Sequence, residues 1–152
     1  EYHPTLLKTL TLKENYLNLL KMIQKKYEMK HVNISFKCND DLFLVEPYQL
    51  VVYRILKELV TNAFKHSNCS QIHVDLTQEN GEIKLIVKDD GKGLTTTEAD
   101  ILNGHKGLNS IKEQLLLLNG EMTISNSPPS GICITIFIPM KGDDSYKHFI
   151  NR

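Results

Sequence analysis

Short segments in which hydrophobic and polar residues alternate constrain the fold of this chain more than any other feature. Successive side chains of a β-strand point to opposite faces of a sheet, so strict alternation predicts strands with one buried face. The alternating segments are 32–36, 72–76, 83–87, 122–124 and 132–138. An Asn80–Gly81 turn separates the second segment from the third, which predicts a β-hairpin.

Three longer segments place hydrophobic residues at helical spacing and predict helices. They are roughly Leu12–Glu28, Tyr48–His66 and Leu108–Leu118. Pro47 fits the first turn of the second helix, and Asn119–Gly120 is a C-terminal stop for the third. The order is helix, strand, helix, hairpin, loop, helix, hairpin. It predicts a two-layer α/β sandwich in which helices pack on one face of a mixed, mostly antiparallel sheet.

Length and composition exclude several classes of protein. The 152 residues fit one domain, and 18 basic residues balance 18 acidic ones, so no net charge draws the chain to nucleic acid or anionic membrane. Three cysteines without a CxxC pair favour a reducing, cytoplasmic setting. No apolar run is long enough to span a bilayer, and no signal peptide opens the chain. Because the chain begins with Glu1, we expect a piece of a longer protein.

The helix predicted over 48–66 carries a polar stripe opposite its hydrophobic face. Four residues share the stripe: Glu58, Asn62, Lys65 and His66. Most such stripes are solvated faces with ordinary charge pairs. A chemical interpretation is that the Asn62 oxygen and the Glu58 carboxylate suit Mg²⁺, which binds oxygen ligands and is shared between protein and phosphate.

An acidic, glycine-rich motif follows the hairpin. Asp89 ends the predicted strand, and Gly91 and Gly93 let the backbone turn sharply and approach a ligand closely. A carboxylate in this place can accept a hydrogen bond from an amino group. Taken alone, the motif is equally consistent with a plain acidic turn.

A second glycine element, Gly104 and Gly107, precedes the helix that begins near Leu108. Backbone N–H groups at a helix N-terminus favour anions such as phosphate. Taken alone, this element is equally consistent with a loop and a helix cap.

The three elements together resemble a known family. An ExxxN helix face, a strand ending in DxGxG and a GxxGL loop entering a helix look like the N, G1 and G2 boxes of the ATP-binding superfamily shared by gyrase, Hsp90, MutL and sensor histidine kinases. The detailed matches are ELVTNAFKHS (58–67), DDGKGL (89–94) and GHKGLNSIKEQLLLLNG (104–120). They resemble the catalytic domain of bacterial two-component sensor histidine kinases of the NarX and DesK type. The resemblance implies a Bergerat-type ATP-binding fold, with a catalytic domain over 1–140 and a polar tail over 141–152.

The resemblance also implies roles for the adenine and metal sites. Asp89 matches the aspartate that accepts a hydrogen bond from the adenine amino group, and Gly91 and Gly93 match the glycines that shape that pocket. Asn62 matches the Mg²⁺ ligand. Glu58 matches the carboxylate that orients or activates groups near the metal and the γ-phosphate.

Further matches concern the phosphates and the ATP lid. Lys65 and His66 match polar residues that reach toward the phosphates, so Glu58, Lys65 and His66 form the expected catalytic group. The stretch from Thr95 to Lys106 matches the lid. The remaining expected nucleotide-binding residues are Gly104, His105, Lys106, Gly107 and Leu108.

Three positions depart from the family pattern. The family often has glycine where Lys106 and Ser110 stand, which bears on lid flexibility and phosphate contacts. Ile132 replaces a threonine near the adenine, which bears on one polar contact to the base.

The resemblance implies a function that this chain completes only with partners. Bound Mg-ATP would give its γ-phosphate to a histidine on a separate helical dimerisation domain, which then phosphorylates a response regulator. The acceptor box of the subgroup is a His followed by an acidic residue, and no His of this chain is so followed. The parent would be a homodimeric, membrane-anchored receptor. This unit would be cytoplasmic, with no nucleic acid partner and no membrane contact of its own.

Other interpretations remain open. A gyrase- or MutL-type clamp would have a longer lid, whereas an anti-sigma-type serine kinase is nearer in size. A degenerate scaffold that binds a partner without ATP is disfavoured by the intact set of Glu58, Asn62, Asp89, Gly91 and Gly93. The His66, Cys69 and His73 set is a weak zinc pattern, because structural zinc normally needs four ligands. The leucines of 115–118 are expected in the core.

Overall fold

The computed structural model describes residues 10–93 and 106–140. The elements are α1 (Leu12–Lys26), the 3₁₀ turn η2 (Glu28–Lys30), β1 (Asn33–Cys38), α2 (Tyr48–His66), β2 (Gln71–Glu79), β3 (Glu82–Asp89), α4 (Lys106–Leu117), β4 (Glu121–Asn126) and β5 (Ile132–Pro139). The predicted helices and strands all occur, and α2 has the predicted bounds.

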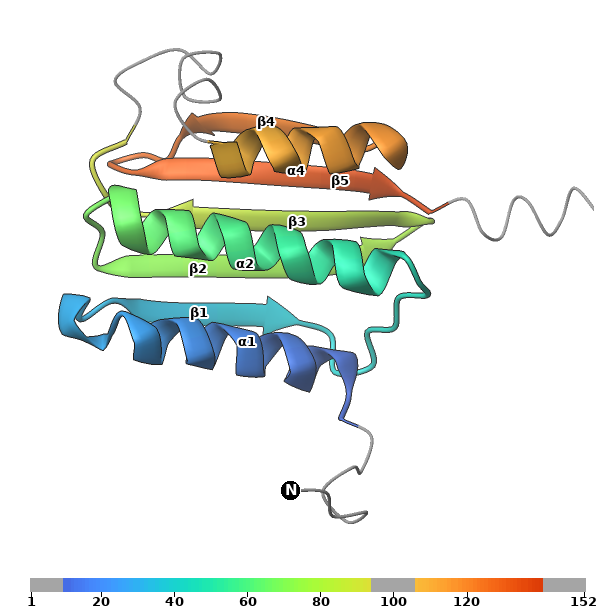
Figure 1. Cartoon of the computed structure of the whole chain (residues 1–152), viewed down its shortest axis with the longest axis horizontal. Coiled ribbons are helices and arrows are strands. Elements are labelled where there is room, and N and C mark those ends of the chain that lie inside the picture. The colour runs from blue at the N-terminus through green and yellow to red at the C-terminus, as the bar shows by residue number, and fades with distance from the viewer. Residues whose placement is uncertain (1–9, 94–105, 141–152) are drawn as a thin grey trace, which may run out of the picture.

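The strands form one mixed sheet in the order β1-β2-β3-β5-β4. β1 pairs with β2 in parallel, and the other three pairs are antiparallel. Figure 1 shows α1, α2 and α4 side by side on one face of this sheet. The predicted two-layer α/β sandwich with helices on one face is therefore confirmed.

Local sequence explains where the helices begin and end. At the start of α1, the Thr11 side chain accepts a hydrogen bond from the Glu14 N–H, and the Glu14 side chain accepts one from the Thr11 N–H. This capping box satisfies two N–H groups that a helix start leaves without partners. At the C-terminal end of α4, Asn119 adopts a left-handed conformation, and the Gly120 N–H donates a hydrogen bond to the Leu115 carbonyl. This bond ends the helix.

The hydrophobic core lies between the helices and the sheet. Its largest fully buried side chains include Tyr16 of α1, Phe64 of α2 and Leu76 of β2. The Tyr16 hydroxyl donates to the Gln49 carbonyl at the start of α2, which joins α1 to α2.

The expectation that residues 115–118 all belong to the core is wrong. Leu115 is 1% exposed, but Leu116 and Leu117 are 70% and 85% exposed. Consecutive helical residues point about 100° apart, so only one of these three leucines faces the sheet.

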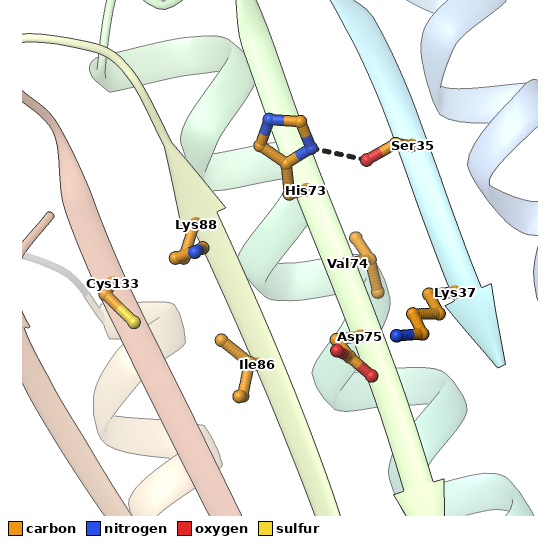
Figure 2. A pocket seen from close by; sticks show the side chains of 8 residues that line it. All are labelled: Ser35, Lys37, His73, Val74, Asp75, Ile86, Lys88 and Cys133. Carbon is orange, nitrogen blue, oxygen red and sulfur yellow. Dashed lines mark hydrogen bonds between the residues drawn. The ribbon is translucent and has the colours of Figure 1, made fainter.

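The face of the sheet away from the helices carries polar side chains. Ser35, His73, Lys88 and Cys133 stand in register across four strands. They border a shallow hollow of about 490 Å³, and the Ser35 hydroxyl pairs with Nδ1 of His73 (Figure 2). No helix of the described chain covers this face.

Candidate functional site

The ends of α2 and β3 meet at one edge of the sandwich (Figure 1). The Lys92 N–H donates to the Ser67 carbonyl at 2.9 Å, which attaches the glycine motif after β3 to the C-terminal cap of α2. A Cβ atom on Gly91 would overlap the Ser67 carbonyl. Glycine is therefore required for this close approach, which places Asp89 beside the polar end of α2.

Asp89 is the one acidic residue that is buried among the described residues, at 8% exposure. Its Oδ1 accepts hydrogen bonds from the Gly91 N–H at 2.8 Å and from the Ile132 N–H at 3.3 Å. Burial raises the pKa of the Asp89 carboxyl, and the two N–H donors partly offset that rise. The carboxylate is fixed by its Oδ1, so its orientation does not depend on a ligand.

Ile132, which stands where the family has threonine, contacts the candidate site through its backbone. This residue contacts Asp89 through its backbone N–H, a group that every residue except proline supplies. The positioning of the Asp89 carboxylate is thus independent of the side chain at 132.

Asp90 holds the outside of the same turn. Its carboxylate accepts hydrogen bonds from the N–H groups of Ser70 and Gln71 and from the Ser70 hydroxyl, at 2.7–2.9 Å. The hydrogen bond from the Gln71 backbone and those from Ser70 lower the pKa of Asp90. Asp90 therefore fastens the turn to the start of β2, whereas Asp89 points inward.

Two glycines bring β5 and its preceding turn against this site. Gly93 and Gly131 both have positive φ, at +75° and +104°. A Cβ on Gly131 would overlap the Asp89 carbonyl, and one on Gly93 would lie 3.2 Å from the Gly131 carbonyl. The three chain segments around Asp89 pack at distances that side chains would prevent.

The polar stripe of α2 occupies the side of the helix that the core leaves open. Glu58 and Asn62 are half-buried, whereas Lys65 and His66 are exposed. Within residues 10–93 and 106–140, the buried Nδ2 of Asn62 has no hydrogen-bond partner. Buried polar groups are normally paired, so this NH₂ group is a donor that a ligand oxygen at the site can use.

A groove of about 320 Å³ separates α2 from α4. Its lining residues on α2 are Arg54, Lys57, Glu58, Thr61 and Lys65, and those on α4 are Gly107, Ser110, Ile111 and Gln114. A Cβ on Gly107 would overlap the Glu58 carboxylate, so glycine lets the first turn of α4 lie directly against Glu58. The N and G2 motifs, far apart in sequence, meet here.

Not all predicted site residues fall within the described chain. Gly104 and His105, with the rest of the expected lid up to residue 105, lie outside it, as does the side chain of Lys106. Leu108 is described and is 4% exposed in the core behind the groove. The structure thus brings together Glu58 with Gly107, and Asp89 with Gly91 and Gly93.

Several residues next to the site were not predicted from the sequence. Ser67, Asp90 and Gly131 hold the turn around Asp89, and Arg54 and Lys57 line the groove. Gly131 carried a signal, because a glycine in a Pro-rich turn often marks a positive φ. The others depend on contacts between distant segments, for which no local pattern exists.

The zinc alternative finds no geometric support. Among residues 10–93 and 106–140, no three His, Cys, Asp or Glu side chains come close enough together to hold a metal ion. The Cys69 thiol instead lies near the Ala63 carbonyl, and burial raises its pKa. Magnesium is a different case, because it keeps water and phosphate oxygens as ligands and needs only one or two protein groups.

Residues 48–142 match the sequence profile of the family described as "Histidine kinase-, DNA gyrase B-, and HSP90-like ATPase". The chain belongs to this family. The matched range includes α2, the Asp89 turn and both sides of the groove, so the whole described part of the candidate site lies within it. None of the described helices has the length and hydrophobicity that a membrane crossing requires.

Bacterial sensor kinases are among the relatives of this chain. The chain is 34% identical over 113 residues to the signal transduction histidine-protein kinase/phosphatase DegS of Bacillus subtilis, a match that covers 72% of this chain and 29% of DegS. It is 29% identical over 143 residues to the sensor protein VraS of Staphylococcus aureus, covering 94% of this chain and 40% of VraS. The expected sensor histidine kinase subgroup is confirmed. The chain spans well under half the length of these relatives.

The fold also matches a solved structure. The histidine kinase domain of the blue-light activated histidine kinase from Erythrobacter litoralis superposes with a TM-score of 0.75 at 17% identity, over 91% of this chain and 65% of that chain. This likeness shows that the two proteins share the same arrangement of helices and strands.

Proposed function

We propose that this chain binds Mg-ATP and donates the γ-phosphate to a histidine on a separate helical dimerisation domain of its parent kinase, from which the phosphoryl group passes to a response regulator. The observation that carries the proposal is the buried Asp89 carboxylate, held by the N–H groups of Gly91 and Ile132 at the edge where the stripe of α2 ends. A fixed, buried acceptor suits the amino group of a base.

The residues of the chain would divide the work by position. Asp89 would accept a hydrogen bond from the adenine amino group, while Gly91 and Gly93 leave room for the ring. Asn62 and Glu58 would hold Mg²⁺, which neutralises charge on the phosphates during transfer. Glu58 would also orient the acceptor, and Lys65 and His66 would approach the phosphates from the last turn of α2.

The residues of the buried site fit Mg-ATP. Among the described residues, Nδ2 of Asn62 has no hydrogen-bond partner, so it could donate to a phosphate oxygen while Oδ1 of the same amide binds Mg²⁺. α2 and α4 leave a groove beside Glu58 rather than closing on it. The first turn of α4 adds backbone N–H groups that favour phosphate. We assign Gly104, His105, Lys106, Gly107 and Leu108 to the same nucleotide site on the family pattern.

The parent protein completes this function. We propose an ATP-binding domain over 1–140 and a polar tail over 141–152, within a homodimeric, membrane-anchored sensor whose cytoplasmic part includes this unit. The response regulator would then receive the phosphoryl group from the dimerisation domain.

Calorimetric titration with a non-hydrolysable ATP analogue and Mg²⁺ tests the nucleotide site on wild type and on Asp89→Asn. Because Oδ1 accepts from two backbone N–H groups, the variant should keep its amide oxygen there and turn its NH₂ group toward the ligand. Two donors would then face each other, so we expect affinity to fall at least about tenfold.

The matched control is Asp75→Asn on the opposite face of the sheet, which should bind as wild type does. Absence of binding in all three proteins would contradict the proposal and favour a scaffold that ignores nucleotide.

A further inference from the structure

The side chains that line the groove between α2 and α4 carry a net positive charge. Arg54, Lys57 and Lys65 face one carboxylate, Glu58. Within the described residues none of these four forms an ion pair at 4 Å or less. All three cationic side chains are exposed, whereas Glu58 is half-buried. An anionic partner would find this charge available.

A hydrophobic residue extends the same face of α2 toward its N-terminus. Leu50, Arg54 and Lys57 stand at positions i, i+4 and i+7, which places them on one side of the helix. Leu50 is 44% exposed, although most hydrophobic residues of α2 are buried. The outer face of α2 thus offers an apolar contact followed by two cations.

The position of the groove identifies its occupant. One end lies at Glu58 and Gly107, the residues assigned above to the phosphate end of the nucleotide site. Reacting atoms must come within about 3–3.5 Å before a phosphoryl group is transferred. A polypeptide that presents an acceptor at Glu58 would then lie close to the faces of α2 and α4 that line the groove.

We propose that this groove docks an acidic, amphipathic helix face of the phosphoacceptor domain, with Leu50 contacting its apolar residues and Arg54 and Lys57 pairing with its carboxylates. This inference rests on the proposed function and adds the surface that orients the acceptor. Arg54 and Lys57 are positioning residues in this arrangement, because they hold the partner without touching ATP.

The test uses the whole parent kinase, with charge reversal by Arg54→Glu and Lys57→Glu together. Both side chains are exposed, so the variant should fold. The matched control is Lys37→Glu with Lys88→Glu on the open face of the sheet, which changes net charge equally but away from the groove (Figure 2).

Two measurements separate docking from nucleotide binding. The Kd of the non-hydrolysable ATP analogue is measured first for both variants, because the groove adjoins the phosphate end of the nucleotide site. Autophosphorylation is then compared at ATP concentrations that saturate each variant. Autophosphorylation at saturating ATP should fall at least about tenfold in the groove variant only. Wild-type autophosphorylation should weaken as salt is raised, and the groove variant should lose that dependence.

Other outcomes would overturn the inference. If the groove variant autophosphorylates as fast as wild type, or the control is equally slow, the groove does not dock the acceptor. If autophosphorylation is normal and only transfer to the response regulator slows, the groove serves the regulator instead. If the wild-type protein does not bind the analogue, the proposed function itself is contradicted, independently of the result for the groove variant.

Discussion

Asp89 and Asp90 are adjacent in sequence, yet their surroundings move their carboxyl pKa values in opposite directions. Asp89 is buried and its pKa is raised, while exposed Asp90 accepts three hydrogen bonds and its pKa is lowered. One carboxylate is placed to meet a ligand, and the other holds the backbone turn that places it. Their roles differ because successive side chains of an extended segment point to opposite sides.

Gly91→Ala tests the close packing at this turn. The added Cβ would overlap the Ser67 carbonyl, so we expect the free energy of unfolding to fall by about 1–3 kcal/mol. The displaced turn should also move Asp89 and weaken binding of the ATP analogue. Urea denaturation and calorimetry measure the two effects.

The control for this variant is Gly81→Ala in the hairpin turn. Gly81 has φ +73° but no atom within 4 Å of an added Cβ, so only backbone strain of about 1 kcal/mol is expected. Its nucleotide binding should not change. Equal binding by Gly91→Ala and wild type would show that the turn can shift without disturbing the site.

At the scale of elements, one side of the short helix α4 packs in the core and another side borders the groove. Leu108, Ile111 and Leu115 face the core, while Gly107 and Ser110 border the groove. The four consecutive leucines do not indicate which side of α4 is buried, because a run of identical residues has no helical periodicity.

A pair of identical substitutions tests the assignment of faces in α4. Leu115→Ala should lower the free energy of unfolding by about 2–5 kcal/mol, because it leaves a cavity in the core. Leu116→Ala removes an exposed side chain and should change stability by less than about 0.5 kcal/mol. Urea denaturation measures the free energy of unfolding of both variants. Equal losses in the two variants would refute the assignment.

At the scale of the whole molecule, the sandwich has two unlike faces. The helical face encloses the core and borders the groove, whereas the other face is polar and uncovered by any described helix. The candidate site lies at one edge, where α2, β3 and the turn before β5 meet. Ligand binding there should restrain several segments at once.

Nucleotide should therefore stabilise the entire fold. An ATP analogue at about 100 times its Kd adds about 2.7 kcal/mol, which raises Tm by about 5–10 °C in a domain of this length. Thermal unfolding followed by circular dichroism measures the shift. Asp89→Asn should show a much smaller shift at the same concentration, and an equal shift would mean that the analogue binds elsewhere.

Local patterns were sufficient for much of this protein. Alternation predicted the strands, and the segment from Tyr48 to His66 predicted α2 with its bounds, because hydrophobic periodicity reflects which side of an element is buried. The motifs around Glu58, Asn62 and Asp89 indicated the family. The family profile confirmed it.

Contacts between distant segments were decided by the tertiary structure alone. The Ile132 N–H on Asp89, the Ser67 carbonyl against Gly91, and Gly107 against Glu58 each join residues that no sequence spacing relates. The same holds for the exposure of Leu116 and the unpaired charge of the groove. Sequence periodicity determines which face of each element is buried, whereas the packing of one element on another determines which polar groups meet.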